Sequence, residues 1–425
     1  MIGASKRSSL AGTWRGHGAA ALVAASLGSL ALGGCGSDKT ASGGPATGFA
    51  VVGSDFTSTV VSLLDADGTL AKDDCIDSGT KAGGHLSLTL SGDVSLPSQP
   101  QQDGKLWLVD RGNAALTVLS PETCEVTSQI SVTTGFKSNP HDVAVLSQSK
   151  AYVTRYDKNV TPTDANSTGD DVLIIDLTRG AVSGRIDLSS YAAPVAGATI
   201  QARPDRMLIA AGQVFVTLAS QDASFQSTGE GRVVVIDPAT DTVTSTIELP
   251  GLKGCSAMSY VDGSNEIFVA CGGSFADADK QADGSGVAAI DLSAAPPAVH
   301  VTKASALGGT PVQPVNFSWV VALSGTRAFT STLGTFPAGS SPGTNDAAFA
   351  FDPTTGASTP ITLDAAAGDL GRGALSGTTL LIPDADFATP RIHVFDAGGA
   401  GAPTETAAVD PDPARGMPPR EIARY

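Results

Sequence analysis

One short phrase recurs seven times along this chain: an apolar, largely β-branched run that ends in Asp or Ser and leads into a turn. In the copy at 232–241, RVVVIDPATD, Asp237 and Pro238 stand where turn geometry favours them, and an alternating run follows at 242–249. The other copies lie at 58–68, 114–124, 171–180, 286–295, 347–356 and 391–400. A lone hairpin is marginal in water, so an array of hairpins must bury its faces against its neighbours.

A second apolar hairpin precedes most copies, with strands such as KAYVTRY at 150–156, QVFVTLA at 213–219 and EIFVACG at 266–272. Each unit therefore holds four strands, termed A to D from first to last. Four short strands repeated seven times predict an all-β fold, a seven-bladed β-propeller over 49–425. No stretch of the mature chain keeps a 3.6-residue apolar period, which excludes a helical solenoid.

The Asp that ends most copies invites comparison with a catalytic carboxylate cluster. These residues are Asp176, Asp237, Asp291, Asp352 and Asp396. One such side chain per unit, directly before a turn, is typical of a residue that stabilises the turn. We therefore expect these carboxylates to be structural and spread around the ring.

The first unit lacks a strand A, because FAVVG at 49–53 reads as its strand B. The segment at 418–425, PPREIARY, matches the strand A that begins PHDVAV at 140–145. We expect this C-terminal strand to complete the first blade and close the ring, which removes exposed strand edges. A disordered tail is the alternative.

The unit that begins at 140 resembles a known repeat. Residues 140–156, PHDVAVLSQSKAYVTRY, and the run at 233–249 are similar to YVTN-type propeller repeats, and AYVTR at 151–155 departs from that signature only at its last residue. The resemblance implies a propeller of the kind found in bacterial surface and periplasmic proteins and structurally similar to lactonase-like propellers. It does not supply a function, because propellers include both enzymes and binding modules.

The first 34 residues are predicted to be a targeting signal. Lys6, Arg7 and Arg15 form a positive region before an apolar run at 19–32 that is too short to span a bilayer comfortably. The sequence LGGC at 32–35 resembles the bacterial lipobox, which implies that Cys35 becomes the lipidated N-terminus of the mature protein. More than one acyl chain holds a protein firmly at a membrane. An ordinary secretory signal is the alternative.

Residues 35–48 are then the lipidated cysteine and a Gly/Ser/Thr-rich flexible linker. Gly36, where some lipoproteins have Asp, favours passage to the outer membrane. We therefore expect a monomeric, lipid-anchored protein of the bacterial cell envelope, held at the outer membrane on its periplasmic or surface face.

The composition excludes one class of partner. The chain has 42 acidic and 26 basic residues and a net charge of −16, and three of the basic residues lie in the signal. Such a chain should not bind nucleic acid or an anionic membrane surface electrostatically. Aromatic residues make up 5% of the chain, too few to favour a stacking platform.

Four cysteines remain if Cys35 is lipidated, in an oxidising compartment. Cys255 and Cys271 lie at the two ends of a hairpin whose turn centres on Gly263, so that 260 should face 266 and 255 should face 271. Cys75 and Cys124 then pair by elimination. Free buried thiols are the alternative.

Long B–C connections occur in five units, at 157–170, 220–231, 273–285, 332–346 and 384–390. They should gather on the face that also holds the starts of the A strands and the ends of the B strands. The candidate ligand-binding residues on this face are His141, Arg155, Tyr156, Arg203, Trp319 and Arg420. The arginines suggest a pocket for an anionic or polar ligand; alternatively, they pair with acids such as Asp142, Asp205 and Glu421.

No catalytic residue can be assigned, because the chain has no GxSxG motif. It also has no His/Cys cluster with metal-ligand spacing, so we predict no metal site and no cofactor. The first hypothesis is a non-enzymatic envelope lipoprotein that binds a partner protein or ligand through its long-loop face. The alternative is a lactonase-like or metal-dependent hydrolase with His141 at the channel mouth.

Overall fold

The computed structural model describes residues 47–425 apart from 262, 277, 309–311, 336–342 and 364–368. Every described residue belongs to one compact unit. The predicted signal, Cys35 and all but the last residues of the predicted linker therefore lie outside the described residues. No helix in the described part is long and apolar enough to cross a membrane.

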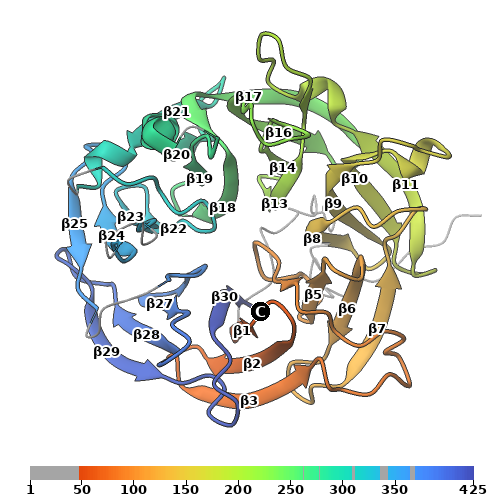
Figure 1. Cartoon of the computed structure of the whole chain (residues 1–425), viewed down its shortest axis with the longest axis horizontal. Helices are drawn as coiled ribbons and strands as arrows, with labels where there is room; N and C mark the ends of the chain where they lie inside the picture. Colours follow the sequence, from red (N-terminus) through yellow and green to blue (C-terminus); the bar gives the residue numbers. More distant parts are fainter. Residues whose placement is uncertain (1–46, 262, 277, 309–311, 336–342, 364–368) are drawn as a thin grey trace, which may run out of the picture. The chain divides into compact units, whose positions relative to one another are not determined.

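Seven four-stranded antiparallel sheets form a ring, so the predicted seven-bladed β-propeller is confirmed (Figure 1). From inner to outer strand, the first three blades are β30(Pro419–Arg424), β1(Gly48–Ser54), β2(Thr59–Asp65), β3(Leu70–Asp77); β4(Val94–Ser95), β5(Leu106–Asp110), β6(Ala115–Leu119), β7(Val126–Ser131); and β8(Pro140–Ser147), β9(Lys150–Lys158), β10(Gly169–Asp176), β11(Ala181–Asp187). The fourth and fifth are β13(Pro204–Ala210), β14(Gln213–Leu218), β16(Glu230–Asp237), β17(Thr242–Lys253); and β18(Cys255–Val261), β19(Glu266–Gly272), β20(Ser285–Asp291), β21(Ala298–Lys303). The last two are β22(Val321–Ser324), β23(Arg327–Thr332), β24(Ala347–Phe351), β25(Ser358–Ile361); and β26(Ala374–Ser376), β27(Thr379–Asp384), β28(Arg391–Asp396), β29(Thr404–Val409).

The remaining elements lie in the connections. They are the strand pair β12(Ile200–Gln201) and β15(Gln221–Asp222), and the short 3-10 helices η1(Ala165–Ser167), η2(Ser189–Tyr191), η3(Ala278–Gly284) and η4(Ala304–Ala306).

The core lies between the blades, which explains why the third strands read as unbroken apolar runs. Successive side chains of a strand point to opposite faces of its sheet. In β16, Val233 and Val235 pack against the fifth blade, whereas Val234 and Ile236 pack against the third. Strands covered on both faces need no polar alternation.

The repeated Asp stabilises the turn that follows each third strand. Oδ1 of Asp237 accepts a hydrogen bond from the backbone N–H of Ala239, 2.9 Å away. The equivalent bond, from Asp to the N–H two residues on, forms at Asp176, Asp291, Asp352 and Asp396. The structural role predicted for these carboxylates is confirmed.

The C-terminal strand closes the ring. β30 is the inner strand of the first blade and pairs antiparallel with β1, with Phe49 opposite Arg424 and Val51 opposite Ile422. Ile422 is buried in the core between the seventh and first blades. The first blade is therefore built from both ends of the propeller chain, as the match between 418–425 and 140–145 predicted.

Both predicted disulfides are present, Cys75–Cys124 and Cys255–Cys271. Cys255 faces Cys271 as expected, but the register nearer the turn was wrong: Tyr260 pairs with Ile267, not with 266. A β-bulge between Cys255 and Met258 offsets this one-residue shift. The two errors cancel because a bulge puts two residues of one strand opposite one of the other.

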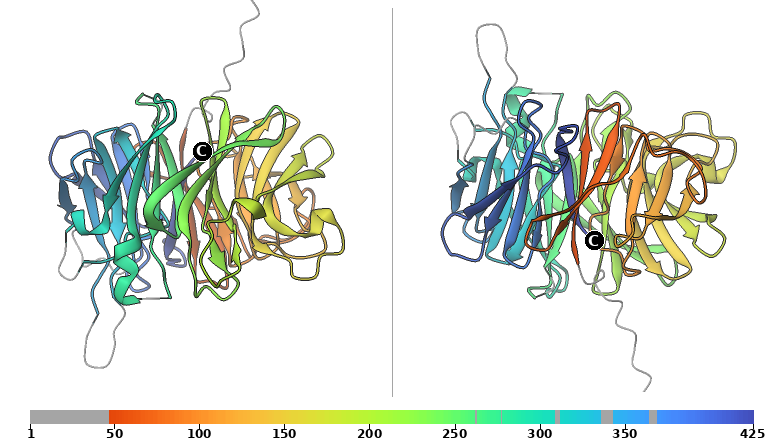
Figure 2. Two further views of the ribbon diagram at one scale, coloured as in Figure 1. Left: turned by 90° about the horizontal axis from the view of Figure 1, so that it is seen from above. Right: turned by 90° about the horizontal axis from the view of Figure 1, so that it is seen from below.

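The two faces of the ring differ (Figure 2). The B–C and D–A connections lie on one face, named the long-loop face, and the A–B and C–D connections lie on the other, named the short-turn face. The five long B–C connections end within two residues of their predicted bounds. The described chain begins on the short-turn face, where the N–H of Thr47 donates to the carbonyl of Tyr425 over 2.7 Å.

Candidate functional site

His141 of β8 and Tyr156 of β9 lie together on the two inner strands of the third blade. The two rings stack, with centroids 4.3 Å apart and planes 9° from parallel. His141 Nδ1 lies 2.7 Å from Oδ1 of Asp205, whose Oδ2 accepts a hydrogen bond from Ser256 Oγ over 2.7 Å. The Nε2 atom of His141 is buried and has no hydrogen-bond partner among the described residues.

The electrostatics of this pair favour an ionised carboxylate. Burial by itself would raise the pKa of Asp205, but His141, Arg206 and the Ser256 hydroxyl lower the pKa to about 2. Burial raises the pKa of Tyr156, so this phenol stays protonated at neutral pH and donates to Gln221 Oε1 over 2.8 Å. An imidazole held by a carboxylate, with its second nitrogen unengaged, is the arrangement that a general base uses.

Arg155 is not available to a ligand, contrary to prediction. It is fully buried, and its Nε and Nη2 atoms each lie 2.7 Å from an oxygen of Asp171. Asp171 is the residue opposite Arg155 in the neighbouring strand, and it is also bonded by Arg185 Nε over 2.6 Å. The alternative that the arginines pair with acids holds here, although with Asp171 and not with the acids named from the sequence.

Arg203 and Arg420 share a different geometry, in which the guanidinium lies between two aromatic rings. Arg203 lies 5.0 Å from the ring centre of Tyr156 and 4.2 Å from that of Phe225. Arg420 lies 4.7 Å from Phe56 and 5.1 Å from Phe387. The aromatic partners come from B–C connections, except Tyr156, which belongs to β9.

Each of these arginines also has polar partners. Arg203 Nη1 lies 3.2 Å from Asp157 Oδ1, and its Nη2 donates to the carbonyl of Asp222. Arg420 Nη1 lies 2.5 Å from Oδ2 of the exposed Asp369. The arginines are therefore fixed in place, and their charge is largely compensated.

Trp319, a candidate ligand-binding residue of the long-loop face, has its side chain in the core. The side chain is 1% exposed, and Nε1 donates to Ser331 Oγ over 2.9 Å. A Cβ added at Gly373 would lie 3.0 Å from Cζ3 of the indole, so the ring packs directly on that backbone. The large apolar ring is buried because it fills the space between the sixth and seventh blades.

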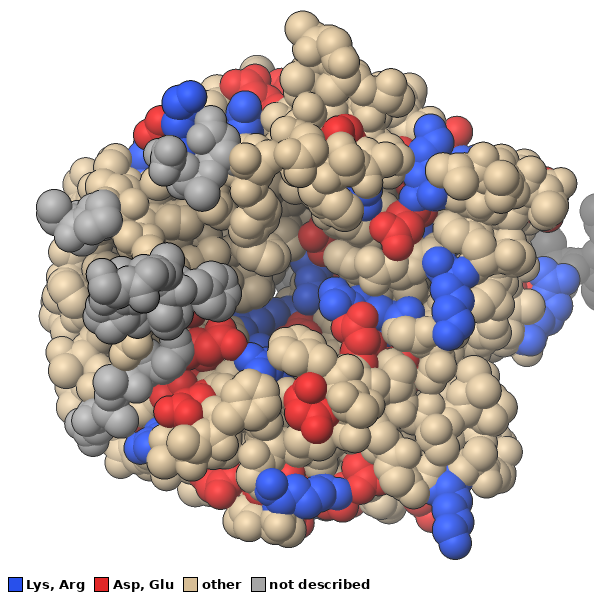
Figure 3. Space-filling view, viewed as in Figure 1, with Lys and Arg blue, Asp and Glu red and all other residues tan. Residues whose placement is uncertain are grey.

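A charged cluster crosses the central channel, and sequence reasoning identified only one of its members. Glu421 Oε1 bonds Arg206 Nη2 over 3.2 Å and also Arg372 Nη1. Burial alone would raise the pKa of Glu421, but the two arginines hold it below its usual value. Figure 3 shows Lys or Arg beside Asp or Glu in the central hollow. The three residues of the cluster also line a cavity of about 140 Å³, together with Phe56, Arg111 and Arg420 among others.

A further feature was missed from the sequence: most of the large apolar side chains that are exposed to solvent belong to one face. Among the described residues they are Phe56, Leu88, Val160, Phe225, Phe275, Val312 and Phe387. All except Leu88 and Val312 lie in B–C connections, and therefore on the long-loop face. Leu88 and Val312 lie in D–A connections, and the backbone of Leu88 bonds the side chain of Gln129 in the outer strand β7, at the rim of the ring. The available signal was a single Phe after Ser or Asp in a polar loop, at 54–56, 223–225, 273–275 and 385–387.

Comparison with known proteins supports the fold alone. No family model matches this chain, and no curated protein matches it. A Bacteroides uniformis protein provisionally named a 6-phosphogluconolactonase is similar in structure, with 14% identity, a TM-score of 0.55, and coverage of 89% of this chain and 100% of that one. A quinonprotein alcohol dehydrogenase-like protein from Bacteroides thetaiotaomicron has 13% identity, a TM-score of 0.51, and coverage of 89% and 78%. Since the two names differ in activity, the likeness identifies a β-propeller and leaves its function open.

Proposed function

We propose that this chain is a non-enzymatic lipoprotein of the bacterial cell envelope that binds a partner protein through its long-loop face. The observation that carries the proposal is that five of the seven exposed large apolar side chains of the described residues lie in the B–C connections of that face. Isolated surface hydrophobic residues are common, but their concentration on one face of a ring favours an interaction surface.

The chemistry of this face also fits a protein partner. Aromatic residues and arginine are enriched at the centres of protein interfaces. Arg203 and Arg420 are already fixed between aromatic rings and carboxylates, so little side-chain freedom would be lost on binding. A preorganised surface of arginines between aromatic rings can contact apolar side chains and, at its edges, carboxylates or carbonyl groups.

The predicted anchor would leave this face accessible. The described chain begins at Thr47 on the short-turn face. A linker from Cys35 to Thr47 spans at most roughly 40 Å when extended. A molecule anchored in this way would be attached from its short-turn face, which leaves the long-loop face accessible to a partner. We retain the outer membrane as the proposed location, on the grounds of Gly36.

Site-specific photo-cross-linking in intact cells tests the proposal. A benzoylphenylalanine would replace Phe56, Phe225 or Phe387 in turn, with matched positions Glu122, Thr240 and Thr355 in exposed turns of the short-turn face. We expect one discrete protein adduct shared by the three Phe positions and absent from the controls. Alanine at the other two Phe positions should reduce its yield. Equal labelling of both faces, or no adduct from the long-loop face, would refute the proposal.

One observation favours the alternative, a hydrolytic enzyme: the unengaged Nε2 of His141, whose ring is oriented by Asp205. In the described residues, no group of three or more His, Cys, Asp or Glu side chains could hold a metal ion, so a metal would need further ligands. Stoichiometric divalent metal in the purified protein, lost in His141→Asn, would favour the enzyme. Lactone hydrolysis that His141→Asn abolishes and Phe56→Ala leaves unchanged would do the same.

A further inference from the structure

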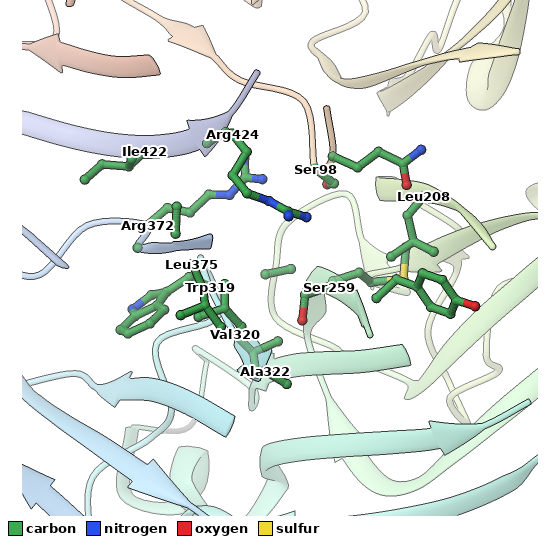
Figure 4. A pocket seen from close by; sticks show the side chains of 18 of the residues that line it. Ser98, Leu208, Ser259, Trp319, Val320, Ala322, Arg372, Leu375, Ile422 and Arg424 are labelled. Atoms are coloured by element: carbon green, nitrogen blue, oxygen red, sulfur yellow. The ribbon is translucent and has the colours of Figure 1, made fainter. Parts of the chain in front are cut away.

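A second cavity, of about 400 Å³, lies in the channel between the inner strands (Figure 4). It adjoins Arg372 of the charged cluster and extends along the inner strands toward the short-turn face. The lining includes Val261 and Arg424, the last residues of β18 and β30. Apolar side chains of the lining include Leu208, Val320 and Leu375. This cavity is distinct from the exposed long-loop face.

Arg424 projects into this cavity and is unpaired (Figure 4). Its guanidinium forms no hydrogen bond or ion pair with any described residue, and it is exposed to the solvent of the channel. The other arginine of the wall, Arg372, is already bonded to Glu421 and to the carbonyls of Leu96 and Pro97. The described lining contains no Asp or Glu.

A second polar group of the wall also lacks a partner. The Oγ atom of Ser259 is buried and forms no hydrogen bond with any described residue. Ser259 lies on β18 and Arg424 on β30, so the two groups come from different blades that line the same cavity. Buried polar groups are normally satisfied, so this hydroxyl is a second unpaired polar group among the residues that line the cavity.

We infer that this cavity binds a small organic carboxylate with an apolar body, and that Arg424 recognises the carboxylate. A guanidinium matches a carboxylate with two parallel hydrogen bonds, and it is only weakly hydrated. Because Arg424 is the one uncompensated charge of the described wall, the site favours a monoanion over phosphate. The apolar side chains of the lining can contact the rest of the ligand, and the volume lies in the range of small-molecule sites.

Calorimetric titration with octanoate and its neutral analogue octanamide tests this inference on the protein without residues 1–35. We expect octanoate to bind at least tenfold more tightly than octanamide. Arg424→Met should weaken octanoate roughly 10- to 100-fold, as loss of a charged hydrogen-bonded pair does, and leave octanamide unchanged. Arg179→Met removes an equal charge from an exposed turn of the third blade and should leave both affinities unchanged.

A second variant tests the location. Ala322 lines the cavity, so Ala322→Phe should abolish binding of both probes while the melting temperature shows that the propeller remains folded. Trp319 forms part of the wall, and its fluorescence should change with octanoate in the wild type and Arg179→Met. Octanoate that fails to bind at millimolar concentration, or that binds Arg424→Met as tightly as the wild type, would overturn the inference. Neither result bears on the long-loop face, which the cross-linking experiment tests separately.

Discussion

At the scale of single residues, Asp346 is a carboxyl group whose environment opposes ionisation. It lies just before β24 and accepts hydrogen bonds from the N–H of Gly334, over 2.6 Å, and of Leu370, over 2.9 Å. Burial, together with the nearby charges of Asp369 and Asp384, raises its pKa to about 6. Asp346 thus joins a B–C connection of the sixth blade to the start of the seventh.

This shift predicts a pH-dependent stability. The native state holds the Asp346 proton up to about pH 6, whereas the unfolded chain releases it near pH 3.8. The free energy of unfolding should therefore fall as the pH rises through this window, by at most roughly 3 kcal/mol from this group. Asp346→Asn removes the titration, so its stability relative to the wild type should improve between pH 4 and pH 7. Denaturant unfolding at several pH values measures this difference; a difference that is constant with pH would contradict the prediction.

The role of a single residue could be predicted from the sequence where its hydrogen-bond partner lies nearby in the chain, and could not be predicted where the partner lies in another strand. The role of Asp237 followed from local chemistry, since its hydrogen bond joins residues two positions apart. The partner of Arg155 did not, because it depends on which residue of β10 lies opposite. The lack of a partner for Arg424 is harder still to foresee, since it depends on six blades that meet around one cavity.

At the scale of secondary-structure elements, the two-residue alternation of the strands and the turn residues predicted the blades. The β-bulges limited how accurately the strand register could be predicted. Strand alternation and turn residues are local, so the order of the strands could be read directly. The β-bulges could not be read from the sequence. They shift the register in the inner hairpins of the third, fourth and fifth blades. The strand at 418–425 could be matched to the first blade because its pattern repeats that at 140–145.

Ring closure gives the prediction for this scale. Deleting 418–425 would remove Ile422 from the core, expose an edge of β1 and leave Arg206 and Arg372 without Glu421. The loss should be several kcal/mol, a large share of the roughly 5–15 kcal/mol that domains possess. We expect calorimetry of the protein without residues 1–35 to show a melting temperature lower by roughly 5 °C or more.

A matched truncation provides the control. Deleting 36–43, a comparable length of the predicted linker, should leave the melting temperature almost unchanged. If both truncated forms melt like the parent, β30 contributes little to the ring, and closure must depend on the packing between blades alone.

At the scale of the whole molecule, the two faces of the ring differ in chemistry more than in architecture. The short-turn face repeats the same Asp-stabilised turn from blade to blade, whereas the long-loop face varies in length and carries the exposed aromatic residues. Repetition made the fold predictable from one sequence. The same repetition could not identify a ligand, because the residues on which we base the binding proposals lie where the repeats diverge.

The last prediction concerns the lipid anchor at Cys35, because the anchor determines which face of the ring is attached to the membrane. Because the described chain begins on the short-turn face, lipidation of Cys35 would tether that face toward the membrane. Cys35→Ser should therefore release the protein from the membrane fraction or leave the precursor uncleaved, because acyl chains supply the membrane affinity. Ser37→Ala, two residues further on, should fractionate as the wild type does, which excludes a general effect of substitution near the cleavage site. Immunoblots of membrane and soluble fractions measure both outcomes. If Cys35→Ser is processed and sediments with the membranes like the wild type, the protein is held there by some other contact, and the long-loop face, with its exposed Phe residues, becomes the first place to look for it.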